Sequence, residues 1–361
     1  VLLAQVDARG ERARLHRRIA TALECAYPEA ERGSHAASLA HHFGQAGDAG
    51  RAAHYGLRAG ARSVHDGALE DAVDQLQATL RHQSRAATPM LEGVRARRLL
   101  GTALIGLGRM QECAVVLLDL HAYVGHSLRP TDRGRVTALL RAVGILAGRR
   151  IMPWLRLRPD LPHPVVRELE HNFVHNSAAL TFTGQPTDIL LSTLQLYLLT
   201  TQAGIRDSRP MYTVTATFLL SLLPLGPLQR LGPQRPTDDP SVLADAVYFE
   251  RMVLSAVNNG RAYWAQTEDI CRRGIADAQA AGDTQRQSMF DVSRMYAALF
   301  TGRQADARDQ ADALIQRAKA GRNTLFANHG IRCLATLDLL QGQPRAALQR
   351  LGPMHHDAVR T

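Results

Sequence analysis

Residues 295–318, which read MYAALFTGRQADARDQADALIQRA, decide the fold class of this chain. Gly302 follows Met295 by seven residues and Ala298 by four, and Ala307 follows Gly302 by five. Residues three or four apart share one face of a helix, and glycine ends a helix readily because it adopts the left-handed conformation. The stretch therefore predicts two helices joined by a turn at Gly302. The inward stripe of the second helix would be Ala307, Ala311, Leu314 and Ala318.

The same spacing recurs along the chain, which indicates an internal repeat. From residue 184 onward, successive glycines of the pattern are separated by 42, 34, 42 and 40 residues, which is the length of one helix pair. We therefore expect an all-α fold, an α-solenoid of about eight degenerate tetratricopeptide-like helical hairpins. The glycines of the pattern are Gly47, Gly67, Gly108, Gly184, Gly226, Gly260, Gly302 and Gly342.

The composition supports helices and argues against several kinds of partner. Hydrophobic residues make up 45% of the chain and aromatic residues only 5%, so that alanine and leucine, both strong helix formers, supply most of the packing. The net charge is +10, but the arginines are scattered and form no basic run, so nucleic acid is not the expected partner. The apolar stretch 211–225 is shorter than the ~20 residues of a spanning helix, so we expect no membrane partner.

The cysteines indicate a reducing environment. Cys25, Cys113, Cys271 and Cys333 are far apart and lack C-x-x-C spacing, which predicts free buried thiols, with no disulfide frame and no zinc site. A reducing compartment favours a cytoplasmic location, and no cofactor is expected.

A proline-rich and arginine-rich stretch interrupts the repeat and divides the expected domains. Prolines break helices, and the glycine pattern lapses between residues 131 and 164. We expect N-terminal hairpins over 1–130, an irregular connection over 131–164 and a C-terminal tetratricopeptide-like array over 165–361. Because a helix is already under way close to Val1, we also expect the chain to continue a longer protein.

Two N-terminal segments carry a family resemblance. Residues 14–20, RLHRRIA, precede Tyr27-Pro28, and residues 39–43, LAHHF, precede Ala46-Gly47-Asp48. Together they resemble the junction that follows the ATPase module in bacterial STAND-type signalling ATPases. That group includes predicted ATPases linked to adenylate or guanylate cyclase or kinase domains, and regulators similar to the maltose-regulon activator. The resemblance implies a helical tail that senses an inducer or a protein and restrains an attached ATPase and output domain.

The chain departs from the full family in what it lacks. It has no G-x-x-x-x-G-K-[ST] loop, and its sole lysine, Lys319, cannot form one. We therefore expect no enzyme activity in this segment and assign no catalytic residue. The leading expectation is a protein-interaction or sensor module of a multidomain signalling ATPase. The alternatives are a helical scaffold within a nucleotide cyclase or kinase, and a fragment of a transcriptional regulator.

The histidines are not favoured as metal ligands. His171 and His175 are four residues apart on an expected helix, but no third ligand is evident. His41 and His42 are adjacent, and adjacent helical residues point in different directions. No metal site is therefore predicted.

The expected binding surface is the concave face that the first helices of stacked hairpins form. Most positions predicted to line it are basic or titratable, and arginine forks bind carboxylates bidentately. We therefore expect an acidic peptide or protein, a neighbouring domain of the same polypeptide, or a small anionic inducer to bind there. The predicted groove residues are Arg95, Arg98, His171, His175, Glu250, Arg251, His329 and Arg332.

Overall fold

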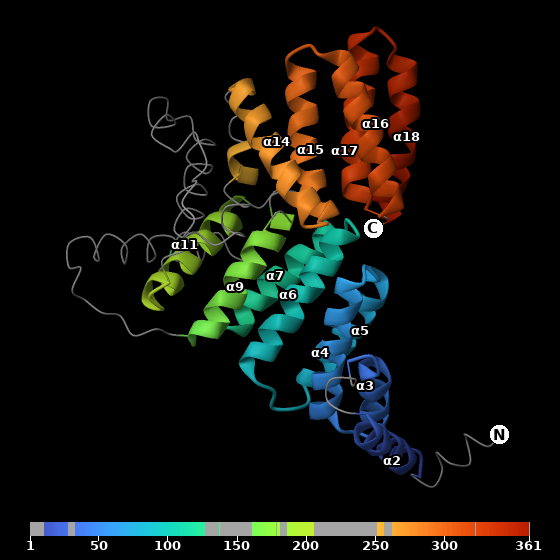
Figure 1. The fold of residues 1–361 in the computed structure, drawn as a ribbon, viewed down its shortest axis with the longest axis vertical. Coiled ribbons are helices and arrows are strands. Elements are labelled where there is room, and N and C mark those ends of the chain that lie inside the picture. The colour runs from blue at the N-terminus through green and yellow to red at the C-terminus, as the bar shows by residue number, and fades with distance from the viewer. Residues whose placement is uncertain are drawn as a thin grey trace, which may run out of the picture. The chain divides into compact units, whose positions relative to one another are not determined.

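The computed structural model describes residues 11–27, 33–126, 137, 161–177, 179–180, 186–205, 251–255, 262–321 and 323–360. Helices make up most of these residues and no strand lies among them, so the predicted all-α helical-repeat fold is confirmed (Figure 1). Within the same residues, no helix has both the length and the apolar character that crossing a bilayer requires.

The chain forms two compact units, which are described separately. One unit comprises Val1–Ile105 and Arg109–Ala203, and the other comprises Gly106–Gly108 and Gly204–Thr361. The described helices of the first unit are α2 (Glu11–Ala26), α3 (Ala36–Gln45), α4 (Ala49–His65), α5 (Leu69–Gln83), α6 (Met90–Gly106), α7 (Met110–Tyr123), α9 (His163–Asn176) and α11 (Pro186–Gln202). Those of the second unit are α14 (Trp264–Ala280), α15 (Thr284–Phe300), α16 (Gln304–Ala320), α17 (Thr324–Leu340) and α18 (Pro344–Arg360).

This division differs from the predicted domain boundary. Helices α9 and α11 belong to the same compact unit as α2 to α7, whereas the prediction groups everything from residue 165 with the C-terminal array. Apart from Thr137 and residues 161–164, the predicted connection 131–164 lies outside the described residues. The apolar stretch 211–225 lies outside them as well.

The predicted glycine turns are present wherever the structure describes them. Gly302 has φ 77° between α15 and α16, and its turn is closed by the Arg303 amide, which donates to the Ala298 carbonyl at 3.0 Å. A non-glycine residue would be strained at such a φ. The pattern glycines with positive φ are Gly47, Gly67, Gly108, Gly302 and Gly342. The remaining three, Gly184, Gly226 and Gly260, lie outside the described residues.

One detail of the repeat differs from simple hairpins. Gly47 and Gly67 flank the same helix, α4, so they mark two successive turns of the run α3, α4 and α5. Gly282, with φ 67°, ends α14 in the same conformation although the predicted pattern does not include it. The glycine pattern therefore marks turns between helices, and only some of those turns are the centres of hairpins.

Small residues allow neighbouring helices to approach closely. A Cβ on Gly60 of α4 would lie 2.5 Å from Cγ of Leu76 on α5, and a Cβ on Gly330 of α17 would lie 2.9 Å from the Ala311 carbonyl oxygen of α16. Both distances are below any normal carbon contact, so only glycine fits at these crossings. Gly60, which precedes Gly67 by seven residues, thus has a packing role.

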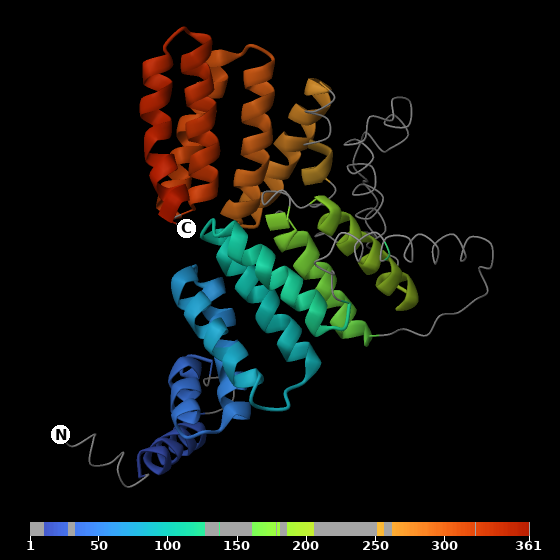
Figure 2. The same ribbon diagram turned by 180° about the vertical axis from the view of Figure 1, so that it is seen from behind.

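The second unit shows how the repeat stacks. Helix α15 contacts both α16 and α17, and the five helices α14 to α18 stand side by side in both views (Figures 1 and 2). The predicted inward stripe of α16 is buried, with relative exposures of 0 to 4%. It packs with Met295, Phe326 and Leu337 in one core cluster. Burial of this stripe is what favours the hairpin, since an isolated helix of this length is marginal in water.

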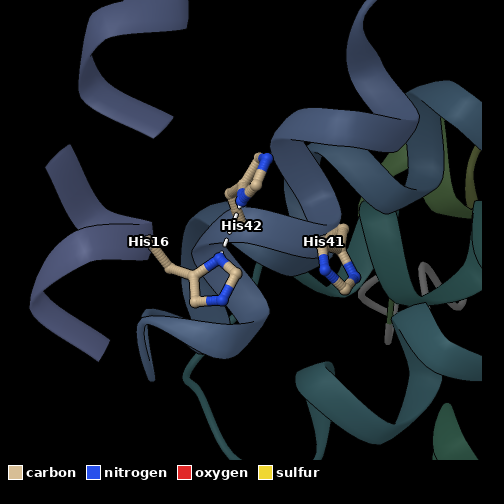
Figure 3. Close-up of side chains that lie close together, drawn as sticks. All are labelled: His16, His41 and His42. Atoms are coloured by element: carbon tan, nitrogen blue, oxygen red, sulfur yellow. Dashed lines mark hydrogen bonds between the residues drawn. The ribbon is translucent and has the colours of Figure 1, made fainter. Parts of the chain in front are cut away.

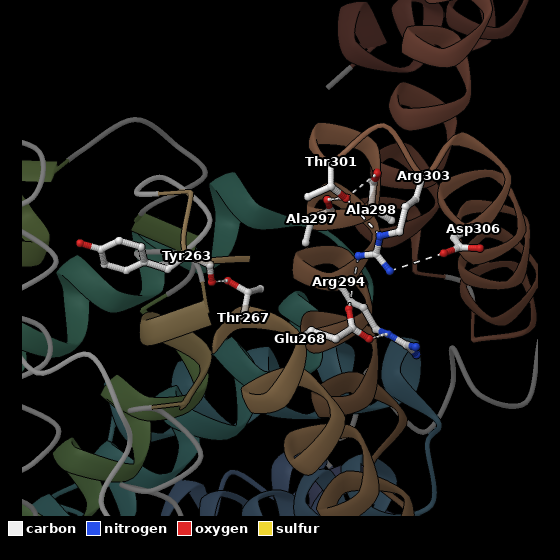
Figure 4. Close-up of polar contacts among 9 residues, drawn as sticks. All are labelled: Tyr263, Thr267, Glu268, Arg294, Ala297, Ala298, Thr301, Arg303 and Asp306. Carbon is white, nitrogen blue, oxygen red and sulfur yellow. Dashed lines mark hydrogen bonds and ion pairs between the residues drawn. The ribbon is translucent and has the colours of Figure 1, made fainter. Parts of the chain in front are cut away.

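Polar contacts join three successive helices of the second unit (Figure 4). Arg294 Nε of α15 donates to Glu268 Oε1 of α14 at 2.7 Å, and Arg303 Nη2 lies 3.7 Å from Glu268 Oε2. Arg303 also donates to Asp306 of α16 at 3.4 Å and to Thr301 Oγ1 at 3.1 Å. These groups are partly exposed, so the network adds to packing between helices without replacing the apolar core.

The cysteine prediction is confirmed in part. All four thiols are free, and Cys113, Cys271 and Cys333 are buried. Burial raises the pKa of Cys113 and Cys271 to about 12, which makes both thiols unreactive at neutral pH. Cys25 is exposed, contrary to the prediction, because it lies on the outer face of the last turn of α2.

Candidate functional site

A groove lies within the first unit where α3 and α5 flank α4. We call it the α3–α5 groove; its volume is about 460 Å³. Its floor on α4 consists of small residues spaced four and three apart, which place one narrow face of that helix toward the opening. These floor residues are Ala52, Gly56 and Ala59.

The floor of the groove consists of small residues because α4 and α5 pack closely there. A Cβ on Gly56 would lie 2.3 Å from Thr79 Oγ1, whose hydroxyl donates to the Gln75 carbonyl at 2.8 Å. Substitution at Gly56 would therefore push α5 away from α4 and change the groove. The small residues of α4 allow the close crossing with α5, and they also leave the space that forms the groove.

The rim of the groove is polar and mainly basic. His41 comes from α3, while Asp74, Gln75 and His82 come from α5, and Arg85 follows α5. Burial lowers the pKa of His82, and the charges of Arg85 and Arg81 lower it further. An entering carboxylate would counter both effects, since opposite charge favours the protonated imidazole. The rim is therefore suited to a ligand that carries a carboxylate.

Gly44 allows the two walls of the groove to meet at one end. A Cβ at this position of α3 would lie 3.1 Å from both Cε1 and Nε2 of His82. The absence of that atom lets the His82 ring lie against the α3 backbone. His82 thus belongs to the rim because a glycine faces it across the groove.

Two predicted groove residues hold an internal carboxylate. Arg95 Nε donates to Glu168 Oε1 at 2.7 Å and Arg98 Nε donates to Glu168 Oε2 at 2.8 Å, so both α6 arginines clamp one residue of α9. Burial alone would raise the pKa of Glu168, but hydrogen bonds and charge from the two arginines outweigh it and hold the pKa below its usual range. An external anion would have to displace Glu168 to bind at this place.

Beyond Glu168, two asparagines further along α9 form a hydrogen-bond network with α6. Asn176 Nδ2 donates to the Arg98 carbonyl at 3.0 Å and to Asn172 Oδ1 at 2.8 Å, and Thr102 Oγ1 donates to Asn176 Oδ1 at 3.4 Å. Asn172 and Asn176 are both buried. These contacts fix α9 against α6, so the predicted arginines have a structural role whether or not they meet a ligand.

The other predicted groove residues fall on both units. His171 and His175 lie half-buried on α9, three and seven residues after Glu168. In the second unit, Arg251 forms an ion pair with Asp277 of α14, and Glu250 lies outside the described residues. The structure brings Arg95 and Arg98 together with α9.

His329 and Arg332 lie on α17 of the second unit. The His329 ring meets Tyr296 of α15 edge-on, with centroids 6.0 Å apart, and Tyr296 stacks on the exposed Phe300. Burial and the nearby charge of Arg332 lower the pKa of His329 to about 4, so the imidazole is neutral at physiological pH. Arg332 itself is exposed. Helix α17, which carries both predicted positions, contacts α15, the first helix of the preceding hairpin.

Three histidines converge elsewhere in the first unit, which corrects one sequence-based argument. Adjacent positions on a helix predict that His41 and His42 point apart, yet each places a ring nitrogen within 4.8 Å of the others in a cluster with His16 of α2 (Figure 3). The rings of His41 and His42 have centroids 5.3 Å apart, and the third ring comes from the neighbouring helix α2. No local spacing could reveal this cluster, since 26 residues separate His16 from His42.

Comparison with known proteins adds no assignment. No protein-family model matches the sequence, and no curated protein matches it. The resemblance to STAND-type signalling ATPases therefore stays a prediction that rests on the residues quoted above.

Proposed function

We propose that this chain is the protein-interaction and sensor module of a multidomain signalling ATPase, and that it binds an acidic peptide segment in the α3–α5 groove. The observation that carries the proposal is the groove itself, a space of about 460 Å³ with a small-residue floor and a mainly basic rim. Helical-repeat proteins use such concavities between stacked helices to bind extended segments. The ATPase half of the proposal rests on the N-terminal family resemblance.

The rim offers hydrogen-bond donors to a carboxylate-bearing ligand. Arg85 supplies a positive charge, which Asp74 offsets in part, and His41 and His82 supply two imidazoles. Arginine binds carboxylates through two parallel hydrogen bonds, and a neutral imidazole becomes a better donor when a carboxylate approaches. The internal clamp of Arg95 and Arg98 on Glu168 shows the same chemistry satisfied within the chain.

A peptide library tests the binding half of the proposal. We expect selection of random peptides on the chain to enrich acidic sequences, and Ala37→Trp to remove their binding. Ala37 is an exposed residue of α3 that lines the groove, so a bulky side chain there fills the space without disturbing the core. Ser38→Trp is the matched control, because Ser38 is exposed on the same helix and does not line the groove.

The chemistry of the rim is tested by reversing one charge. Arg85→Glu should weaken acidic peptides by about tenfold or more, in line with a charge-assisted hydrogen bond of ~1.5 to 3 kcal/mol. Arg62→Glu is the control, since Arg62 is an exposed arginine of α4 outside the groove. Equal affinity of the selected peptides for the wild type, Ala37→Trp and Arg85→Glu would contradict binding in this groove.

A further inference from the structure

The three-histidine cluster of the first unit has the composition of a transition-metal site. His16 lies on α2, while His41 and His42 lie on α3, and one ring nitrogen from each lies within 4.8 Å of the other two. Figure 3 shows the His16 ring reaching from α2 toward the two rings of α3. The ring centroids of His16 lie 5.0 Å from His42 and 5.8 Å from His41.

The closest pair within the cluster is already joined by a hydrogen bond. Nδ1 of His16 and Nδ1 of His42 lie 2.8 Å apart. Two neutral imidazoles can face each other at this distance only if one nitrogen carries the proton and the other accepts it, because two lone pairs repel and two protons collide. A metal ion could take the place of the proton in this hydrogen bond, since it accepts a lone pair from both nitrogens at once.

The geometry is close to what a zinc-like ion requires. Zn–N bonds of ~2.0 to 2.1 Å in a tetrahedral site place the ligand nitrogens about 3.3 Å apart. The His16–His42 pair needs only a small opening from 2.8 Å, and His41 must move inward. His41 is exposed, so rotation of its side chain meets little resistance. Imidazole is a favoured ligand of Zn²⁺, Cu²⁺ and Ni²⁺, and three histidines leave a fourth position for water.

The helices that carry the ligands are already held together beside the cluster. Helix α2 packs on α3, and the Arg17 guanidinium of α2 donates to the Ala46 carbonyl at the end of α3, at 3.2 Å. This contact fixes the two helices on the side of the histidines. A metal ion would therefore bind to a largely preformed pair of helices and would not need to assemble them.

We propose that His16, His41 and His42 form a binding site for a divalent transition-metal ion of the Zn²⁺ type, which ties α2 to α3. The metal site does not require a peptide in the α3–α5 groove, but the two places share His41, so a bound metal ion would withdraw that imidazole from the rim of the groove. Its consequence is local: a bound metal ion would add a further link between α2, the first described helix, and α3.

Cobalt is the appropriate probe, because tetrahedral Co²⁺ absorbs visible light and replaces Zn²⁺ in imidazole sites. The whole chain, freed of any polyhistidine tag, should bind one Co²⁺ with visible absorption bands, and added Zn²⁺ should displace it. His16→Ala and His42→Ala should each weaken Co²⁺ and Zn²⁺ binding by more than about tenfold, since each removes a ligand.

Matched controls separate this site from other histidines. His54→Ala and His65→Ala change exposed histidines of α4 outside the cluster and should leave binding unchanged. His41→Ala provides a third cluster variant at an exposed position, where loss of the fold is not expected. Circular dichroism establishes that each variant is folded. Absence of Co²⁺ binding by the wild type, or binding kept by the folded His16→Ala and His42→Ala variants, would overturn the proposal.

Discussion

Lowering the pH from 7 to 5 should weaken the packing of α7 against α11, because it favours protonation of a buried histidine that is neutral in the folded chain. His121 of α7 is buried, and its Nε2 lies 2.7 Å from Ser192 Oγ of α11. Burial is the main cause that lowers the pKa of His121 to about 4 from the ordinary 6.5, and the positive charge of His126 adds to it. The folded chain therefore holds this imidazole in its neutral form.

The sign and size of the effect follow from these two pKa values. Between pH 6.5 and pH 4 the unfolded chain binds a proton that the folded chain does not, so stability falls as the pH drops through this window. Above pH 6.5 the contribution is fully present, and below pH 4 no more is lost. Integration of the two titrations from pH 7 to pH 5 gives a loss of about 2 kcal/mol from this residue.

A variant isolates His121 from every other titrating group. His121→Gln keeps a hydrogen-bonding side chain opposite Ser192 but cannot titrate, so we expect the wild type to lose about 2 kcal/mol more than the variant between pH 7 and pH 5. Urea unfolding at both pH values measures the difference. Since the two units need not unfold together, hydrogen exchange of α7 gives the local free energy. Equal losses within about 0.5 kcal/mol would refute the reasoning.

Two further substitutions test the packing described above. Gly60→Ala should destabilise the first unit by about 1 to 3 kcal/mol, because its Cβ would lie 2.5 Å from Leu76 Cγ, which outweighs the gain of up to ~1 kcal/mol in helix propensity. Gly50→Ala, exposed on the same helix, should be neutral or stabilising in the same urea titration. Glu168→Gln should lower the free energy of unfolding of the first unit by about 1 to 3 kcal/mol, because it removes the negative charge that binds both Arg95 and Arg98. Asp119→Asn, in a pair whose carboxylate is more than half exposed, should cost less than about 1 kcal/mol, and equal costs for these two would contradict the clamp.

The turns and the fold class were predictable because their signals are local. A glycine that follows apolar residues by seven and four positions and precedes a small residue by five predicts a turn such as that at Gly302, and the structure has positive φ there. The inward stripe that begins at Ala307 follows from the helical period alone. Gly282 escapes the prediction because no residue pattern of the same form surrounds it.

The contacts that shape the sites were not predictable in the same way. The positions of Arg95 and Arg98 on the concave face could be predicted from their spacing to a glycine of the repeat. Their partner Glu168 lies 73 and 70 residues away from them in the sequence, so no local pattern indicates the contact. The α3–α5 groove depends on the distance between α3 and α5 where they flank α4. The close crossing at Gly56 and the space beside it are seen only in the packing of the helices.

The proposal that this chain is the sensor module of a signalling ATPase is tested most directly by the ATP hydrolysis rate of the whole protein that the gene encodes. The rate would be measured with and without a peptide selected for the α3–α5 groove, in the wild type and in Ala37→Trp. We predict that the peptide changes the wild-type rate and leaves the rate of Ala37→Trp unchanged. A full-length product that hydrolyses no ATP, or whose rate stays constant while the peptide is bound, would contradict the account.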